Sequence, residues 1–242
     1  SDVVDSAEEH FVAALVDERA SRGAISVDPK VRTRLTANAI ASDAENTAAE
    51  AALAELLRIG ADIGVDLSVF KGLAIGHRFY SDPHRRPAVD IDVFAAPRSL
   101  ERLGDLIREL GGAEQDAVAV DAMSGTSRVF EITVDVRGTP VDIHRDPMNL
   151  LVPSVDEDER WARTTTIDVP DVGRVRTLDL EDTVIQAALH LFRDNFADLL
   201  HINDVRLMMN ADPDWDEVER RADLNGWTSL VRYALWFVSD QL

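Results

Sequence analysis

The sequence predicts an α+β protein in which a core of strands and short helices lies between two helical regions. Three observations predict it. Apolar residues recur at helical spacing over residues 1–62, strand-like and helix-like segments alternate over residues 63–178, and helical spacing returns over residues 179–242. We therefore expect an N-terminal helical region, an α/β core and a C-terminal helical region with these boundaries.

The N-terminal region predicts two helices. Residues 7–19 place Phe11 and Leu15 on one face, and Gly23 marks the end of that helix. A longer helix begins at Asp28-Pro29, because aspartate caps a helix and proline fits its first position. It runs into an alanine-rich stretch at residues 48–57. We expect this whole region to serve packing.

The α/β core predicts two hairpins and further strands. Arg137-Gly138 forms the tight turn of one hairpin, and residues 171–173 form the turn of the other. The charged run at residues 156–160 between them predicts a solvated loop. Strands are expected at residues 65–70, 88–94, 128–136, 139–144, 164–169 and 174–178, and helices at 73–80 and 99–110.

The C-terminal region predicts a series of helices. Asp179 caps the first of them, residues 198–209 and 215–222 continue the pattern, and the strongly apolar stretch 227–238 is the last. His190 and His201 lie within these helices and are expected to be satisfied core histidines. The sequence stops within a helical pattern, which leaves open that the natural chain continues past residue 242.

Composition excludes several classes of protein and partner. The chain has no cysteine, so a metal must be held by oxygen or imidazole rather than by thiolate. The formal net charge of −20 repels phosphates and makes nucleic acid an unfavourable partner. No apolar run is long enough to span a bilayer, and the sequence shows no basic-then-apolar leader. We therefore expect a cytoplasmic protein without a membrane partner.

Two aspartates interrupt an otherwise apolar strand. Asp90 and Asp92 are two residues apart, so in a strand both side chains point to the same face. Carboxylates placed in this way repel each other unless a divalent cation lies between them. Mg²⁺ suits the pair, because it binds one or two carboxylates together with phosphate oxygens and water.

A third aspartate repeats this pattern. Asp142 lies between Val141 and Ile143, so it faces away from the apolar side of its strand. If that strand pairs beside the first, Asp142 joins Asp90 and Asp92. Three carboxylates around two metal ions are used for in-line phosphoryl or nucleotidyl transfer. We expect these three aspartates to be both catalytic and metal-binding, with Mg²⁺ or Mn²⁺ as the ion.

Other residues near these strands are candidate ligand-binding groups. Gly72 stands at a strand-to-helix junction, where the backbone can approach a ligand and the helix offers free N–H groups to phosphate. Lys71 adds a positive charge at the same turn. His144 shares the face of Asp142, so it is a candidate ligand or proton carrier, and a structural role is equally open.

The order of these candidate residues along the chain resembles that of the nucleotidyltransferase superfamily related to DNA polymerase beta, and within it a bacterial family of uncharacterised nucleotidyltransferases. That family has a Lys-Gly turn, a short helix ending in an aromatic residue, an arginine, Asp-x-Asp and a later Asp-x-His, followed by a helical histidine and an aspartate. The corresponding residues of this chain are Lys71-Gly72, Phe79-Tyr80, Arg86, Asp90-Ile91-Asp92, Asp142-Ile143-His144, His190 and Asp204. The resemblance covers roughly residues 50–235.

The resemblance implies a mixed sheet flanked by helices, Mg²⁺ and a nucleoside triphosphate such as ATP as the donor. It makes Asp90 and Asp92 metal ligands and Asp142 the third carboxylate, and it favours Arg86 over Arg85 as a phosphate-binding residue. The implied activity moves a nucleoside monophosphate to an unidentified acceptor. The acidic composition favours a small molecule or a peptide over nucleic acid as that acceptor.

Two alternatives stay open. One is a nucleotidyltransferase toxin that modifies RNA, which would need a basic groove near Arg85, Arg86 and Arg128. The other is a non-catalytic nucleotide-binding module of the same fold. Its motivation is the Lys71-Gly72 turn, because the wider superfamily usually has Gly-Ser there.

Overall fold

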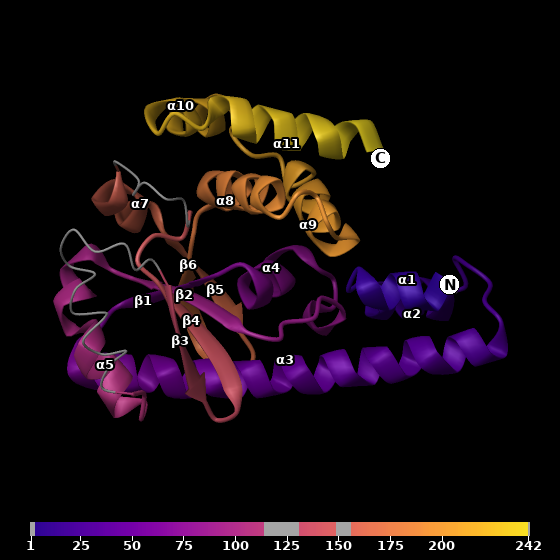
Figure 1. The fold of residues 1–242 in the computed structure, drawn as a ribbon, viewed down its shortest axis with the longest axis horizontal. Helices are drawn as coiled ribbons and strands as arrows, with labels where there is room; N and C mark the ends of the chain where they lie inside the picture. Colours follow the sequence, from indigo (N-terminus) through magenta and orange to yellow (C-terminus); the bar gives the residue numbers. More distant parts are fainter. Residues whose placement is uncertain (1–2, 114–130, 149–155, 242) are drawn as a thin grey trace.

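A six-stranded mixed sheet forms the centre of the molecule in the computed structural model, which describes residues 3–113, 131–148 and 156–241 (Figure 1). The strand order is β3-β4-β2-β1-β6-β5. Parallel pairing joins β2 to β4 and β1 to β6, and the other three pairs are antiparallel. The α+β class and the mixed sheet are therefore confirmed. The strands are β1 (Leu67–Phe70), β2 (Ile91–Ala95), β3 (Glu131–Val136), β4 (Thr139–His144), β5 (Thr165–Val169) and β6 (Gly173–Thr177).

Helices lie on both sides of this sheet. The long helix α3 runs along one side, and α8 to α11 lie together on the other (Figure 1). The helices are α1 (Val3–Glu9), α2 (Ala13–Ser21), α3 (Pro29–Ile63), α4 (Gly72–Phe79), α5 (Leu103–Glu109), α7 (Glu157–Arg163), α8 (Leu180–Arg193), α9 (Leu199–Met209), α10 (Trp215–Leu224) and α11 (Thr228–Gln241), with 3₁₀ turns η1 (Pro83–Arg85) and η2 (Pro97–Arg102). None of the helices in the described ranges combines the length and apolar character that a membrane span requires.

The helix boundaries follow the capping signals of the sequence. The Asp28 side chain accepts a hydrogen bond from the Lys30 N–H at the start of α3, and Gly64 adopts a left-handed conformation at its end. The prediction of one helix at residues 7–19 is wrong, because the chain turns at Phe11, whose φ is 57°, and continues as α2. Residues 99–110 likewise begin as a 3₁₀ turn and become α-helical at Leu103.

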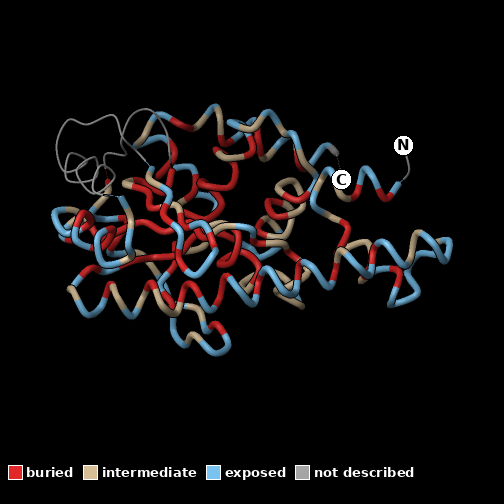
Figure 2. Tube along the Cα trace, turned by 60° about the horizontal axis from the view of Figure 1, so that its bottom comes forward, coloured by how far each residue is buried: buried red, intermediate tan, exposed pale blue. Residues whose placement is uncertain are grey.

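The sheet has an apolar face and a mixed face. Ile91 and Val93 of β2 belong to the core that α3 covers with Leu53 and Leu56. Buried and exposed residues alternate along α3, as Figure 2 shows, because only one side of that helix meets the sheet. Phe94 packs with Phe70 and Trp161 in a separate cluster. The alternation expected for β2 therefore places the even-numbered side chains, Asp92 among them, away from α3.

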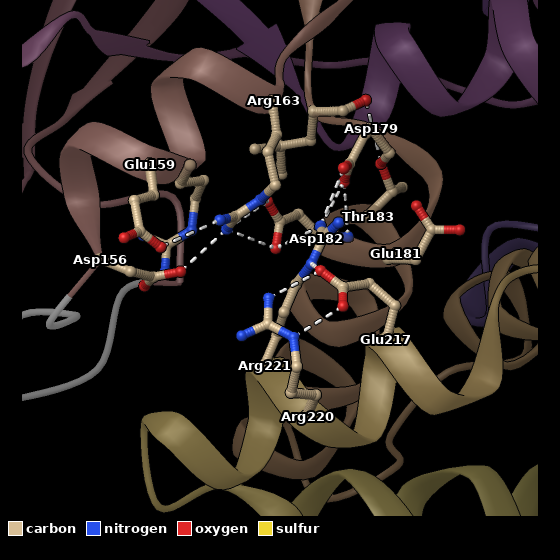
Figure 3. A network of polar contacts seen from close by, with 12 residues as sticks. Asp156, Glu159, Arg163, Asp179, Glu181, Asp182, Thr183, Glu217, Arg220 and Arg221 are labelled. Carbon is tan, nitrogen blue, oxygen red and sulfur yellow. Dashed lines mark hydrogen bonds and ion pairs between the residues drawn. The ribbon is translucent and has the colours of Figure 1, made fainter.

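The charged run at residues 156–160 is not a solvated loop, and that prediction is wrong. Asp156 stands at the N-cap position of α7 without a capping hydrogen bond from its side chain, and both Asp156 and Arg160 are buried. Arg163 pairs with Asp156 at 2.8 Å and with Asp182 of α8 at 3.0 Å, and Arg221 of α10 reaches Asp182 at 3.1 Å. Figure 3 shows these side chains converging from three helices. The charges hold α7 to the C-terminal helices.

Candidate active site

The three predicted aspartates meet at one cleft. Asp92 and Asp142 are register partners on the parallel strands β2 and β4, so their side chains lie side by side. Asp90 is not inside the strand as expected, because β2 begins at Ile91, yet it lines the same cleft. The cleft has a volume of about 280 Å³. Pairing of two distant strands thus brings together the carboxylates that the alternation pattern indicated.

Asp92 is the most strongly held of the three. Its Oδ1 accepts a hydrogen bond from Lys71 Nζ at 2.5 Å and lies 2.8 Å from His144 Nε2. Burial opposes its ionisation, but the hydrogen bond from His144 and the charge of Lys71 outweigh burial and lower the pKa of Asp92 to about 2. Asp92 is therefore an anion at neutral pH.

Asp142 and Asp90 have fewer partners. The Thr133 hydroxyl of β3 donates to Asp142 Oδ1 at 2.6 Å. Burial, together with the charges of Asp92 and Asp142, raises the pKa of Asp90 above its ordinary value. The cleft thus concentrates negative charge that its own lysine offsets only in part.

The residues present fit a divalent cation that prefers oxygen. Ligand atoms of Asp92, Asp142 and His144 all lie within 4.8 Å of one another. Within the described residues, Oδ2 of Asp92 and Oδ2 of Asp142 accept no hydrogen bond, so one oxygen of each carboxylate remains for a ligand. Mg²⁺ and Mn²⁺ match carboxylate oxygens of this kind. His144, fully buried, already holds Asp92 and fits a role in orienting that carboxylate.

The Lys71-Gly72 turn lies next to the carboxylate of Asp92. Lys71 has φ 53°, a conformation uncommon for a residue with a side chain, and it precedes the first turn of α4. Phe70 pairs with Asp92 across β1 and β2, which places the following Lys71 beside that carboxylate. A Cβ on Gly72 would lie 3.2 Å from Arg86 Nη1 and 3.6 Å from Ala88 Cβ, so the turn has little room for a larger residue.

Arg86 lies close to this turn and forms its hydrogen bonds with other residues of the chain. Its Nη2 donates to Asp204 Oδ2 at 2.8 Å, its Nε lies 3.1 Å from the same oxygen, and its Nη1 donates to the Pro87 carbonyl. Tyr80 also donates to Asp204, at 2.6 Å. Arg86 lines the cleft, but its nitrogens are engaged, and this geometry favours support of the turn over direct contact with phosphate.

Polar residues of α3 that the sequence analysis did not single out position the segment before β2. Ser42 donates to the His84 carbonyl at 2.6 Å, and Asn46 donates to the Arg86 carbonyl at 3.1 Å. Glu50 lies 2.8 Å from His77 Nε2 and 2.9 Å from His84 Nε2. The three helix residues are four apart and share one face. That spacing of polar residues in an alanine-rich helix could have indicated, from the sequence alone, a helix face that forms polar contacts.

Residues of both terminal helical regions and of the segment before β2 also line the cleft. Phe11 from the α1–α2 turn and Val89, both exposed, line it together with Arg193. His190 and His201 line it as well, so the prediction that they are core histidines is wrong. Both are only partly buried.

A basic groove for RNA finds no support among the described residues. Arg86 pairs with Asp204 and Arg85 with Asp82 at 2.9 Å. Arg128, the third residue of that hypothesis, lies outside the described residues.

Comparison with known proteins identifies the family of the chain and supports its fold. Residues 1–242 match the model of the family described as "Uncharacterised nucleotidyltransferase", and the chain belongs to that family. The fold is similar to the solution structure of the antibiotic-resistance factor ANT(2'')-Ia, with a TM-score of 0.51, 16% identity and coverage of 81% of this chain and 100% of that one. A nucleotidyltransferase-like antigenic protein from Paracoccidioides brasiliensis matches at a TM-score of 0.42 and 14% identity, over 78% of this chain and 92% of that one. No curated protein sequence matches the chain.

Proposed function

We propose that this protein is a Mg²⁺-dependent nucleotidyltransferase that moves a nucleoside monophosphate from a nucleoside triphosphate to an acceptor. The observation that carries the proposal is the adjacency of Asp92 and Asp142 on parallel strands, with one oxygen of each left without a hydrogen bond among the described residues. Family membership supports the reaction class. Asp90, Asp92 and Asp142 would hold the metal, or Mn²⁺ in its place.

The turn before α4 would receive the triphosphate. The first N–H groups of α4 follow Lys71 directly, and a helix N-terminus favours bound phosphate. Lys71 Nζ lies at the same point and can exchange its bond to Asp92 for a phosphate oxygen. Arg86 lies close to the turn, because a Cβ on Gly72 would come within 3.2 Å of its Nη1, and its pair with Asp204 fixes it there. Mg²⁺, when bound, would offset the charge of the triphosphate and its leaving group.

The proposed transfer is a displacement at the α-phosphorus of the triphosphate. The acceptor oxygen forms a bond to the α-phosphorus, the bond from that phosphorus to pyrophosphate breaks, and the acceptor proton passes to a carboxylate of the cleft. His144 and Thr133 hold Asp92 and Asp142 in place during this step. Such positioning is the main contribution a protein makes to transfer of this kind.

A small molecule or a peptide is the acceptor class we propose. The net charge of −20 disfavours a polyanionic acceptor, and the cleft wall offers Phe11 and Val89 as apolar contacts. The ANT(2'')-Ia likeness is one of fold at low identity and does not select an acceptor.

A thermal-shift experiment with ATP, GTP, CTP and UTP, each with and without Mg²⁺ or Mn²⁺, tests the donor site. A ligand that binds the native state raises the melting temperature by mass action. We expect a metal-dependent rise with at least one triphosphate. Absence of a rise with all four would contradict the proposed donor. Binding without pyrophosphate release in the presence of candidate acceptors would favour the non-catalytic module.

A further inference from the structure

Two histidines and an aspartate gather where α8 ends and α9 begins. His190 lies in the last turn of α8, Asp194 caps the end of that helix, and His201 lies in the first turn of α9. Ligand atoms of the three lie within 4.8 Å of one another. The arrangement is separate from Asp92, Asp142 and His144, although both histidines line the same cleft.

The distances suit a shared metal ion. His190 Nδ1 lies 3.3 Å from Asp194 Oδ2, close to the separation of about 3.3 Å between two ligands bonded at about 2.0–2.1 Å to one tetrahedral ion. With bonds of that length, two imidazoles on one tetrahedral ion place their ring centres about 5.2 Å apart. The rings of His190 and His201 are 4.6 Å apart. Their spacing on the two helices needs little adjustment for coordination.

Neighbouring groups prepare these side chains as ligands. Asp198 Oδ2 lies 3.0 Å from His201 Nδ1, so the carboxylate fixes the ring and leaves Nε2 for a metal. The same aspartate caps α9 by accepting the His201 N–H, which makes its position rigid. Arg193 donates to Asp194 Oδ1 and leaves Oδ2 toward His190.

The chemistry of the ligands distinguishes this group from the aspartate cluster. Mg²⁺ prefers oxygen ligands and binds imidazole poorly, whereas Zn²⁺ accepts imidazole and carboxylate together. Two imidazoles and one carboxylate form the ligand set of several catalytic zinc sites, which keep a fourth position open.

We propose that His190, Asp194 and His201 form a second metal site, selective for a transition-metal ion such as Zn²⁺, beside the cleft of the aspartates. Three protein ligands leave one position for water or for a donor atom of a molecule bound in the cleft. The site does not depend on nucleotide transfer, and it can exist whether or not the proposed reaction takes place.

Zinc binding to the full chain after removal of metals tests the proposal. Competition with a chromophoric chelator measures the affinity, and Co²⁺ in place of Zn²⁺ reports coordination through its visible ligand-field bands. We expect one tight Zn²⁺ per chain. His190→Ala and His201→Ala should each weaken it at least about 100-fold, because loss of a ligand's supporting partner alone costs about 10–100-fold. Asp198→Asn, which keeps both histidines, should weaken it by that smaller factor.

Two matched controls separate this site from the rest of the protein. His10→Ala removes a histidine of the N-terminal region and should leave Zn²⁺ affinity unchanged. Asp92→Asn should also leave it unchanged while weakening Mg²⁺-dependent triphosphate binding, so the two proposals can fail separately. Circular dichroism of each variant verifies its fold. Equal Zn²⁺ affinity in the wild type and in His190→Ala and His201→Ala, or no Zn²⁺ binding to the wild type, would overturn the proposal.

Discussion

Replacing Asp204 by alanine would leave the Arg86 guanidinium without its charge partner in a buried position. The side chains of Arg86 and Asp204 are only 5% and 2% exposed, so water cannot take the place of the lost carboxylate without rearrangement. Removing one partner of a buried pair costs about 3–5 kcal/mol. Tyr80 keeps its hydrogen bond from Asn203 but loses its acceptor on Asp204, which adds about 1 kcal/mol.

Urea unfolding followed by circular dichroism measures this loss. With a dependence on urea of about 2 kcal/mol per molar, a total loss of about 4–6 kcal/mol lowers the unfolding midpoint by about 2–3 M. Asp62→Ala is the matched control, because it breaks the exposed pair with Arg58 and should change stability by less than about 1 kcal/mol. An Asp204→Ala variant as stable as Asp62→Ala would show that Asp204 does not neutralise a desolvated charge on Arg86.

Three further predictions concern the turn, the cleft and the charged network. Gly72→Ala should weaken Mg²⁺-dependent triphosphate binding in calorimetry, because the new Cβ would lie 3.2 Å from Arg86 Nη1; unchanged affinity would show that the turn is not the phosphate site. Thr133→Val removes the donor to Asp142 on an exposed strand position, so it should cost less than about 1 kcal/mol of stability yet weaken metal-dependent binding, and an unaffected affinity would count against Asp142 as a ligand. Hydrogen bonds from Arg220 and Arg221 lower the pKa of Glu217 to about 2 in the folded state, from about 4.5 in the unfolded chain. Ionised Glu217 therefore stabilises the folded state above pH 4.5, and this contribution is lost as the pH falls toward 2. Glu217→Gln should be less stable than the wild type at neutral pH by an amount that shrinks in acid, and a pH-independent difference in urea unfolding would contradict this.

The sequence predicted the parts of the site that depend on local periodicity. Acidic and apolar residues alternate in two strands, and this alternation predicted that Asp92 and Asp142 share one face of the sheet if β2 and β4 pair, as they do. The Asp28-Pro29 signal likewise located the start of α3, because capping depends on a few neighbouring residues.

Features that depend on tertiary contacts were missed. Asp156, Arg160 and Arg163 are spaced four and three apart, which is helical, but their burial depends on Asp182 and Arg221 from distant helices. A charged run without known partners is indistinguishable from a solvated one. The approach of His190 to His201 depends on the turn between α8 and α9, which local spacing does not specify.

Calorimetric titration with a triphosphate analogue that resists cleavage, in the presence of Mg²⁺, tests whether Asp92 and Asp142 form a metal-dependent donor site. We expect the wild type to bind the analogue only with metal, and Asp92→Asn and Asp142→Asn each to weaken binding at least about tenfold, or about 1.4 kcal/mol. Asp168→Asn, an exposed aspartate on β5, should bind as the wild type does. Equal affinity in all four proteins, or binding independent of metal, would contradict the assignment of these carboxylates to a metal-dependent donor site.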